Sequence, residues 1–266
     1  MCLLNHAGRN TRSLVSEMNE THESNRVYWN NSAEGWAKRT EERGLWDQCH
    51  RDPTLVLSPG EMRFLRDVKA NKVCVLGSGD NEVVFALAGM GARVTSVDIS
   101  EAQLKIAAQR AETLGLKVNF VRADVTELDK LGDKAFEVVY TGGHVSVWVS
   151  DLQRYYSEAV RILRSGGTFI VNEYHPFRRV WQDETDDLDL YYNYFDRGPY
   201  EYMSTEGLSQ VEYHWTVSDH IQAVLDAGCE LLKVAEHGQG FDEWRKTDLR
   251  RLPEYILIVG RKILAG

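Results

Sequence analysis

The chain has 266 residues, a net charge of −9 and an isoelectric point near 5.4. This length fits one large α/β domain with a small extra lobe. Nucleic-acid surfaces rely on clustered Lys and Arg, so the acidic balance makes RNA or DNA an unfavoured partner. The four scattered cysteines form no CxxC pair, and no apolar stretch approaches membrane-spanning length. We therefore expect a cytoplasmic protein without a metal site, disulfides or membrane contact.

The N-terminal part divides into two segments. Residues 1–24 lack the apolar core of a signal peptide and are predicted to be a flexible polar arm. Residues 25–70 are predicted to form a helical cap on a single domain that extends to residue 266. Tyr28, Trp29 and Trp36 lie among charged residues in this cap. That pattern is typical of an amphipathic helix whose aromatic side chains meet a partner surface.

From residue 72 onward, short apolar strands alternate with helices. This alternation predicts a doubly wound, mostly parallel sheet of seven strands with helices on both faces. Right-handed crossovers place the carboxyl ends of parallel strands along one edge, where functional residues are expected. The predicted strands are 72–76, 93–97, 117–121, 136–140, 167–172, 230–235 and 255–263, and the predicted helices are 81–90, 100–114, 150–163 and 217–228, with Ser100 and Ser150 as caps.

The regular alternation stops at Tyr174. Residues 176–215 are dense in Tyr, Trp and Asp. Long irregular segments inside compact domains are usually functional, so we interpret this one as an inserted, aromatic-rich lid over the active edge. The alternative is a surface excursion with no role in chemistry.

The turn after the first strand has the residues of a ligand-binding loop. Gly77-Ser78-Gly79 lets the backbone turn tightly and approach a ligand, and the following helix start offers free N–H groups. Asp98 ends the second strand, where a carboxylate can accept both hydroxyls of a ribose. Asp124 follows the third strand and can reach an adenine amino group, with Ile99 and Val125 as apolar walls. Taken singly, each aspartate is equally a helix cap.

Two features disfavour NAD(P) as the adenosine cofactor. A dinucleotide fingerprint needs a third glycine at the helix start, where this chain has Glu82. The Tyr-x-x-x-Lys pair of short-chain dehydrogenases is also missing, as is a Walker A loop.

Residues 70–175 resemble the class I S-adenosylmethionine (SAM)-dependent methyltransferases in motif order and spacing. The resemblance implies a Rossmann-like fold, SAM as cofactor and S-adenosylhomocysteine as product. Val75 stands in place of the usual acid of the first motif, and Asn81 in place of its third glycine, so we expect the methionyl end to be held differently. The matching segments are Val73–Gly79, Val94–Ser100, Phe120–Asp124, Phe136–Tyr140 and Leu163–Phe169.

This resemblance implies an EC 2.1.1 enzyme that transfers a methyl group by in-line displacement to a small-molecule acceptor. A nucleotide-dependent oxidoreductase on the same scaffold and a non-catalytic SAM- or nucleotide-binding module stay open as alternatives, and so does a homodimer. His144 and His175 end strands at the active edge and are candidate bases, although a structural role is the commoner one for a lone histidine. The candidate cofactor-binding residues are Gly77, Ser78, Gly79, Asn81, Asp98, Ile99, Asp124, Val125, Thr141 and Gly142, with Tyr28, Trp29 and Trp36 over the methionyl part, and the candidate substrate-binding residues are Tyr174, Arg178 and Tyr194.

Overall fold

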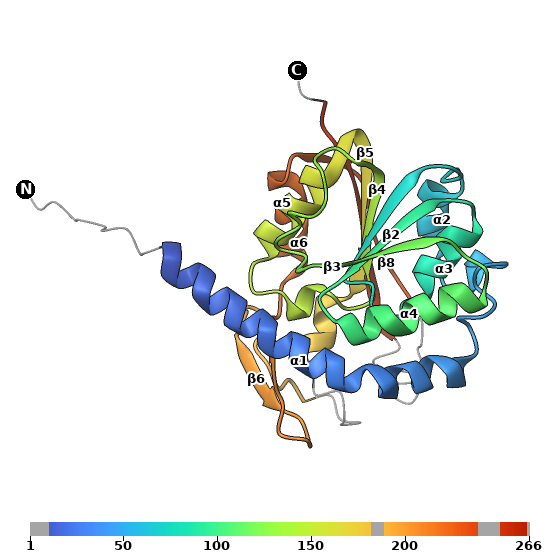
Figure 1. Cartoon of the computed structure of the whole chain (residues 1–266). Coiled ribbons are helices and arrows are strands. Elements are labelled where there is room, and N and C mark those ends of the chain that lie inside the picture. Colours follow the sequence, from blue (N-terminus) through green and yellow to red (C-terminus); the bar gives the residue numbers. More distant parts are fainter. Residues whose placement is uncertain (1–10, 182–188, 239–250, 265–266) are drawn as a thin grey trace, which may run out of the picture.

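A seven-stranded sheet forms the centre of the molecule (Figure 1), in a computed structural model that describes residues 11–181, 189–238 and 251–264. The strand order is β3-β2-β1-β4-β5-β9-β8. β9 runs antiparallel to its neighbours β5 and β8, and the remaining pairs are parallel. The predicted fold class is thus confirmed. The strands are β1 (Lys72–Leu76), β2 (Arg93–Asp98), β3 (Val118–Arg122), β4 (Phe136–Gly142), β5 (Leu163–Tyr174), β8 (Cys229–His237) and β9 (Tyr255–Lys262).

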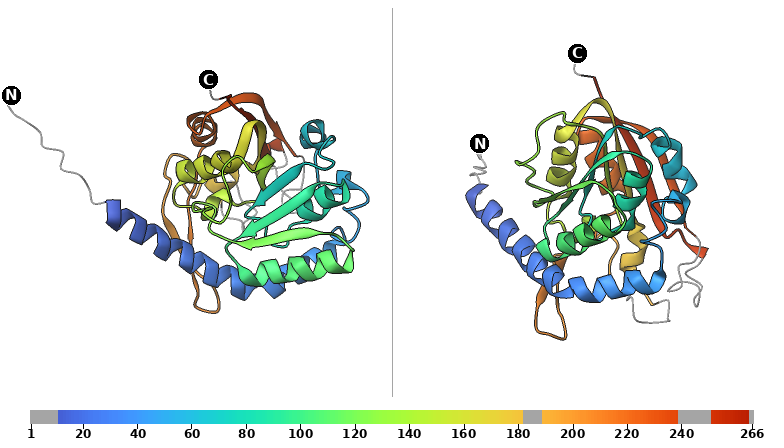
Figure 2. Two further views of the ribbon diagram at one scale, coloured as in Figure 1. Left: turned by 45° about the horizontal axis from the view of Figure 1, so that its top comes forward. Right: turned by 45° about the vertical axis from the view of Figure 1, so that its right-hand side comes forward.

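Helices cover both faces of this sheet (Figures 1 and 2). On one face, Leu65 and Phe85 pack with Val73 of β1. On the other face, Tyr155 and Val224 pack in one cluster with Cys74 and Leu76, the alternate residues of β1. Since both faces are buried, β1 is apolar at four successive positions rather than at alternate ones. The first face carries α2 (Pro59–Leu65), α3 (Glu82–Gly89) and α4 (Glu101–Thr113), and the second carries α5 (Leu152–Ile162) and α6 (Val217–Asp226).

The start of α5 corrects one predicted cap. Asp151, not Ser150, accepts the hydrogen bond from the backbone N–H of Arg154, at 2.9 Å. Serine and aspartate both cap helices well, and the two residues are neighbours in the chain, so the sequence alone does not decide which one caps α5. The Ser150 hydroxyl is instead 3.0 Å from the ring of His22.

Helix α1 corrects the predicted flexible arm. It runs without a break from Thr11 to Arg43, so residues 11–24 are helical, while residues 1–10 lie outside the described residues. Contacts with distant parts of the chain hold this helix. The Asn25 side chain donates to the Val211 carbonyl at 2.9 Å and accepts from the Val211 N–H at 2.8 Å. The helix therefore begins where tertiary contacts allow, which a local pattern does not reveal.

The predicted insertion contains a hairpin that lies against α1 (Figure 1). A short 3₁₀ helix, η3 (Pro176–Val180), follows β5, and residues 182–188 lie outside the described residues. The hairpin strands are β6 (Tyr200–Met203) and β7 (Ser209–Glu212), paired antiparallel. Two further 3₁₀ turns, η1 (Pro53–Leu55) and η2 (Ser146–Trp148), precede α2 and follow β4.

Candidate functional site

Helix α1 crosses the edge at which the parallel strands end (Figure 2). Its Asn30 side chain accepts hydrogen bonds from the Ser100 hydroxyl (2.7 Å) and the Ala102 N–H (3.2 Å) at the start of α4, just after β2. Its Thr40 hydroxyl donates to Asp80, after β1, at 3.1 Å. The predicted cofactor residues therefore lie beneath one long helix.

The two glycines of the turn after β1 have different roles. Both have positive φ, +60° at Gly77 and +48° at Gly79. A Cβ on Gly77 would lie 2.4 Å from Val145, so packing requires glycine there. A Cβ on Gly79 would face the side chains of Gln103 (3.7 Å) and Asp98 (4.0 Å). Gly79 is therefore the glycine that keeps open the space beside the Asp98 carboxylate.

Two predicted residues of this turn serve the fold through their side chains. The Ser78 hydroxyl is buried and lies 2.6 Å from the hydroxyl of Ser96 in β2. The Asn81 side chain accepts from the Val83 N–H at 2.9 Å and caps α3. The Ser78 hydroxyl and the Asn81 side-chain oxygen thus hold the turn in place.

Asp98 and Gln103 together form an acceptor pair beside Gly79. The Asp98 carboxylate accepts from the Gly79 N–H (2.7 Å) and the Ser100 N–H (2.8 Å). Burial outweighs these bonds and raises the pKa of Asp98 to about 6. The side-chain oxygen of Gln103 is buried and has no hydrogen-bond partner. A buried acceptor without a donor is costly, so the pair fits a ligand that brings hydroxyl groups, as a ribose does.

Asp124 is largely engaged by protein groups. Its Oδ1 accepts from the N–H (2.8 Å) and the hydroxyl (2.7 Å) of Thr126, and its Oδ2 lies 2.5 Å from His22 Nδ1. Burial alone would raise the pKa of Asp124, but the hydrogen bond and charge of His22 outweigh it, so the pKa is lowered. A carboxylate has about four acceptor sites, and one is left for an adenine amino group. The neighbouring Val125 is buried in the core.

We expect His22→Ala to loosen the N-terminal half of α1. The change leaves the Asp124 carboxylate partly buried without its imidazole partner, which costs about 1–3 kcal/mol. Amide hydrogen exchange across residues 20–30 should accelerate by about 5- to 100-fold. Glu20→Ala, at an exposed position on the same helix, is the matched control and should leave exchange unchanged. Equal exchange in the two variants would contradict the anchoring role of His22.

The carboxyl end of β4 contributes backbone rather than the predicted side chains. The Thr141 hydroxyl is hydrogen-bonded to that of Tyr155, inside the core. A Cβ on Gly142 would lie 2.6 Å from the Asn172 carbonyl, so a glycine is needed for strand packing. His144 follows with φ +82°, a backbone strain that non-glycine residues adopt mainly at functional sites.

Buried Glu173, at the end of β5, holds the loop that carries His144. Its carboxylate accepts from the N–H groups of Val145 (3.1 Å) and Ser146 (3.3 Å). Burial raises its pKa to about 7 despite these bonds. Glu173 is not among the predicted site residues, since only the fold turns it towards the neighbouring loop.

An aromatic cluster joins α1 to the loop after β4. The rings of Tyr28 and Trp29 lie 6.0 Å and 5.1 Å from that of Trp148 in η2, and Trp36 lies 5.8 Å from Trp29. The structure thus brings the three predicted aromatic residues together near the active edge. Trp148, which no sequence motif marked, is the residue on which they assemble.

The two candidate bases have partners in the protein. His144 Nε2 is hydrogen-bonded to the Arg179 guanidinium, and burial together with the Arg179 charge holds the His144 pKa well below its usual value. His175 Nδ1 accepts from the Phe177 N–H at 3.2 Å, and its Nε2 lies 2.9 Å from Glu236. Both ring nitrogens of His175 are therefore engaged, and it caps η3.

The predicted substrate residues lie in two different places. Tyr174 lies edge-on to His144, with ring centroids 4.8 Å apart, and the Arg178 guanidinium lies 4.3 Å from the Tyr174 ring centroid. These side chains stay grouped at the end of β5. The Tyr194 hydroxyl instead accepts from the Val217 N–H at 3.1 Å, at the start of α6. Tyr194 thus holds the insertion to α6.

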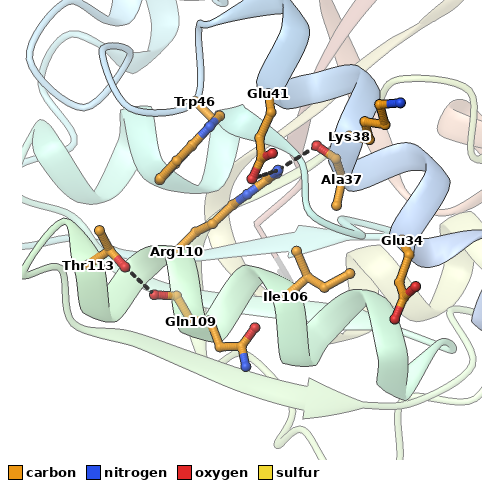
Figure 3. Close-up of a pocket in the computed structure, with 9 residues that line it drawn as sticks. All are labelled: Glu34, Ala37, Lys38, Glu41, Trp46, Ile106, Gln109, Arg110 and Thr113. Carbon is orange, nitrogen blue, oxygen red and sulfur yellow. Dashed lines mark hydrogen bonds and ion pairs between the residues drawn. The ribbon is translucent and has the colours of Figure 1, made fainter.

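A separate open groove of about 450 Å³ lies between α1 and α4 (Figure 3). Arg110 of α4 forms its inner wall, where the guanidinium donates to Asp80 (2.6 Å), the Thr40 hydroxyl (2.8 Å) and the Ala37 carbonyl (2.8 Å). Arg110 therefore ties α4, α1 and the segment after Gly79 together. The groove is lined by Glu34, Ala37, Lys38, Glu41, Trp46, Ile106, Gln109, Arg110 and Thr113.

Comparisons with known proteins agree with this fold. Residues 74–171, from β1 to the end of β5, match the methyltransferase domain family. The uncharacterized methyltransferase YbaJ of Bacillus subtilis (strain 168) is 26% identical over 183 residues, which cover 65% of this chain and 71% of the relative. A ubiquinone biosynthesis O-methyltransferase of Coxiella burnetii is 24% identical over 153 residues, which cover 56% of this chain and 64% of that relative. The crystal structure of an S-adenosylmethionine-dependent methyltransferase from Mesorhizobium loti has a TM-score of 0.55 and 20% identity, covering 77% of this chain and 99% of that one.

The sheet order, the glycine turn after β1 and the acid at the end of β2 define a Rossmann-like fold with an adenosine site. Together with the matched domain, they show that residues 74–171 form a SAM-dependent methyltransferase domain, an enzyme domain with SAM as its cofactor. The comparisons give no support to the oxidoreductase alternative. Over the described ranges, none of the helices is long and apolar enough to cross a membrane.

Proposed function

We propose that the enzyme transfers the SAM methyl group to a small-molecule acceptor, bound between the ends of β4 and β5 and the insertion of residues 176–215. One observation supports this proposal: a small cavity of about 20 Å³ there is lined by His144 and Tyr174 from the strand ends and by Arg179 and His214 from the insertion. The insertion thus closes the site as a lid, which suits a small acceptor. The acidic net charge also favours a small acceptor over a nucleic acid.

The same residues divide the work of binding. In this proposal Asp98 and Gln103 accept the ribose hydroxyls, and Asp124 accepts the adenine amino group. The rings of Tyr28, Trp29 and Trp148 offer faces that attract a cation such as a sulfonium. SAM supplies an electrophilic methyl group. The protein then aligns the acceptor atom with that group and excludes water, which alone contributes a large part of such a rate enhancement.

Radiolabelled SAM tests the acceptor class. The full-length enzyme is incubated with methyl-labelled SAM and a cell extract, which is then separated into small-molecule and macromolecular fractions. We expect the label in the small-molecule fraction. Label in RNA or protein would contradict the proposal, and SAM binding without any transfer would favour the non-catalytic module.

We expect SAM affinity to fall as the pH is lowered below about 6. The raised folded-state pKa of Asp98 means that its protonated form stabilises the ligand-free protein at low pH, and this contribution is lost as the pH rises through about 6. The hydroxyl groups of a ribose instead need the ionised carboxylate. The dissociation constant should therefore rise by up to about tenfold per pH unit below this value. Calorimetry across this pH range should give the slope for the wild type and a smaller one for Asp98→Asn, and equal slopes would exclude Asp98 as the titrating group.

A further inference from the structure

Asn25 of α1 connects three parts of the molecule through one side chain, which is 2% exposed. Its amide nitrogen donates to the Val211 carbonyl in β7 at 2.9 Å and to the Trp148 carbonyl in η2 at 3.1 Å. Its oxygen accepts from the Val211 N–H at 2.8 Å. The amide therefore uses both its donors and its acceptor. It joins α1, the loop after β4 and the hairpin of the insertion.

The bonds to Val211 close the open edge of the hairpin. Val211 pairs with Glu201 of β6, yet it directs both its N–H and its C=O at Asn25. A residue of an antiparallel ladder directs both groups to the same side, so the Asn25 amide takes the place of a third strand. The Ser24 hydroxyl adds a bond to the Ser209 carbonyl at 3.1 Å. Because an isolated two-stranded hairpin is only marginally stable, these contacts with α1 hold it.

The same stretch of α1 contacts the ends of two parallel strands. His22, three residues before Asn25 and thus on the same face of the helix, lies 2.5 Å from Asp124, after β3. Asn30 accepts from the Ser100 hydroxyl, after β2, at 2.7 Å. The helix rises only about 12 Å from His22 to Asn30. About two turns of one helix therefore contact both the proposed adenosine site and the hairpin.

The position of α1 allows one of these regions to influence the other. The hairpin extends past α1 on the side away from α4, which begins just after Asp98 (Figures 1 and 2). A ligand that contacts Asp98 and Asp124 restricts the motion of the helix that lies over them. The restricted helix then holds Asn25 in the position that Val211 requires. Ordering of a shared element by a ligand produces positive coupling without any change of shape.

We propose, on the basis of the function proposed above, that Asn25 is a positioning residue that couples the cofactor site to the insertion. Occupation of the adenosine site stabilises the hairpin through α1. The coupling needs no direct contact between the hairpin and the ligand, because α1 lies against both regions. Since the hairpin belongs to the insertion that borders the proposed acceptor site, the bound cofactor determines how firmly that border is held.

Amide hydrogen exchange of the full-length protein, with and without saturating S-adenosylhomocysteine, tests this coupling. The readout is the ratio of the two exchange rates across residues 200–212. In the wild type the ligand should slow exchange there by at least about fivefold. In Asn25→Ala this ratio should fall below about twofold, while the ligand still protects the glycine turn after β1. Asn31→Ala, which removes an exposed asparagine of the same helix, should keep the wild-type ratio.

The ratio separates coupling from a merely structural role. A structural role of Asn25 would raise exchange equally in both states and leave the ratio unchanged, which would overturn the inference. A wild type in which the ligand protects the glycine turn but not the hairpin would overturn it as well. Absence of S-adenosylhomocysteine binding by the wild type would instead overturn the proposed function, and the inference with it.

A second variant keeps the test decisive if Asn25→Ala does not fold. Asn25→Asp keeps the size of the side chain and an acceptor for the Val211 N–H, but it has no amide donor for the Val211 and Trp148 carbonyls. Its exchange ratio across the hairpin should also fall towards one. A wild-type ratio in Asn25→Asp would overturn the inference.

Discussion

Replacing Asp98 by Asn should weaken SAM binding by at least about 100-fold. The carboxylate is the ionisable acceptor beside Gly79 and accepts hydrogen bonds from two backbone N–H groups. An asparagine amide would point its NH₂ group, a donor, either at the ribose hydroxyls or at one of these N–H groups. Loss of two charge-assisted hydrogen bonds costs about 3–6 kcal/mol. Isothermal titration calorimetry measures the change directly.

A matched control separates this effect from general destabilisation. Asp129→Asn removes a carboxylate at an exposed position beyond the adenine segment and should bind SAM as the wild type does. Thermal unfolding should show that Asp98→Asn is folded at the assay temperature. Binding by Asp98→Asn within threefold of the wild type would refute the assigned role of this carboxylate.

Replacing Arg110 by Met should lower the free energy of unfolding by about 3–5 kcal/mol. The guanidinium is 6% exposed and bonds to Asp80, Thr40 and the Ala37 carbonyl. Its removal leaves the Asp80 carboxylate, itself only 10% exposed, without its cation. An uncompensated buried charge destabilises the folded state strongly. Urea unfolding followed by circular dichroism gives the free energy.

Two further variants separate the loss of the buried ion pair from the general effect of replacing an arginine. Arg66→Met removes a guanidinium that is 72% exposed and should change stability by less than about 1 kcal/mol. The double variant Arg110→Met/Asp80→Asn no longer buries a lone charge and should be more stable than Arg110→Met alone. A single Arg110→Met variant as stable as the wild type would show that this pair does not hold α1 to the sheet.

The strands and the position of Asp98 at the end of β2 could be predicted because their signals are local. The run before Gly77 is apolar at successive positions, and Asp98 ends the next β-branched strand, so each is visible in a few residues. The start of α1 was missed for the opposite reason. Its anchors, His22 and Asn25, contact residues more than 100 positions away. No local pattern carries that information.

The candidate site shows the same division. The spacing placed the glycine turn between β1 and α3 correctly, but it did not give the direction of the Ser78 and Thr141 side chains, which point into the core. Gln103 lies within the predicted helix 100–114, and its unpaired oxygen becomes visible only once that helix is placed. His214 lies 70 positions from His144, and the fold of the insertion alone brings both to one pocket.

Calorimetric titration of the full-length protein with SAM, with S-adenosylhomocysteine and with NADPH tests the central claim most directly. The account predicts one site of about micromolar affinity for both sulfur ligands and no heat with NADPH. Asp98→Asn, measured in the same series, should bind both sulfur ligands at least about 100-fold more weakly. Binding of NADPH in place of SAM, or no binding of either sulfur ligand by the folded protein, would contradict the claim that this edge of the sheet is a SAM site.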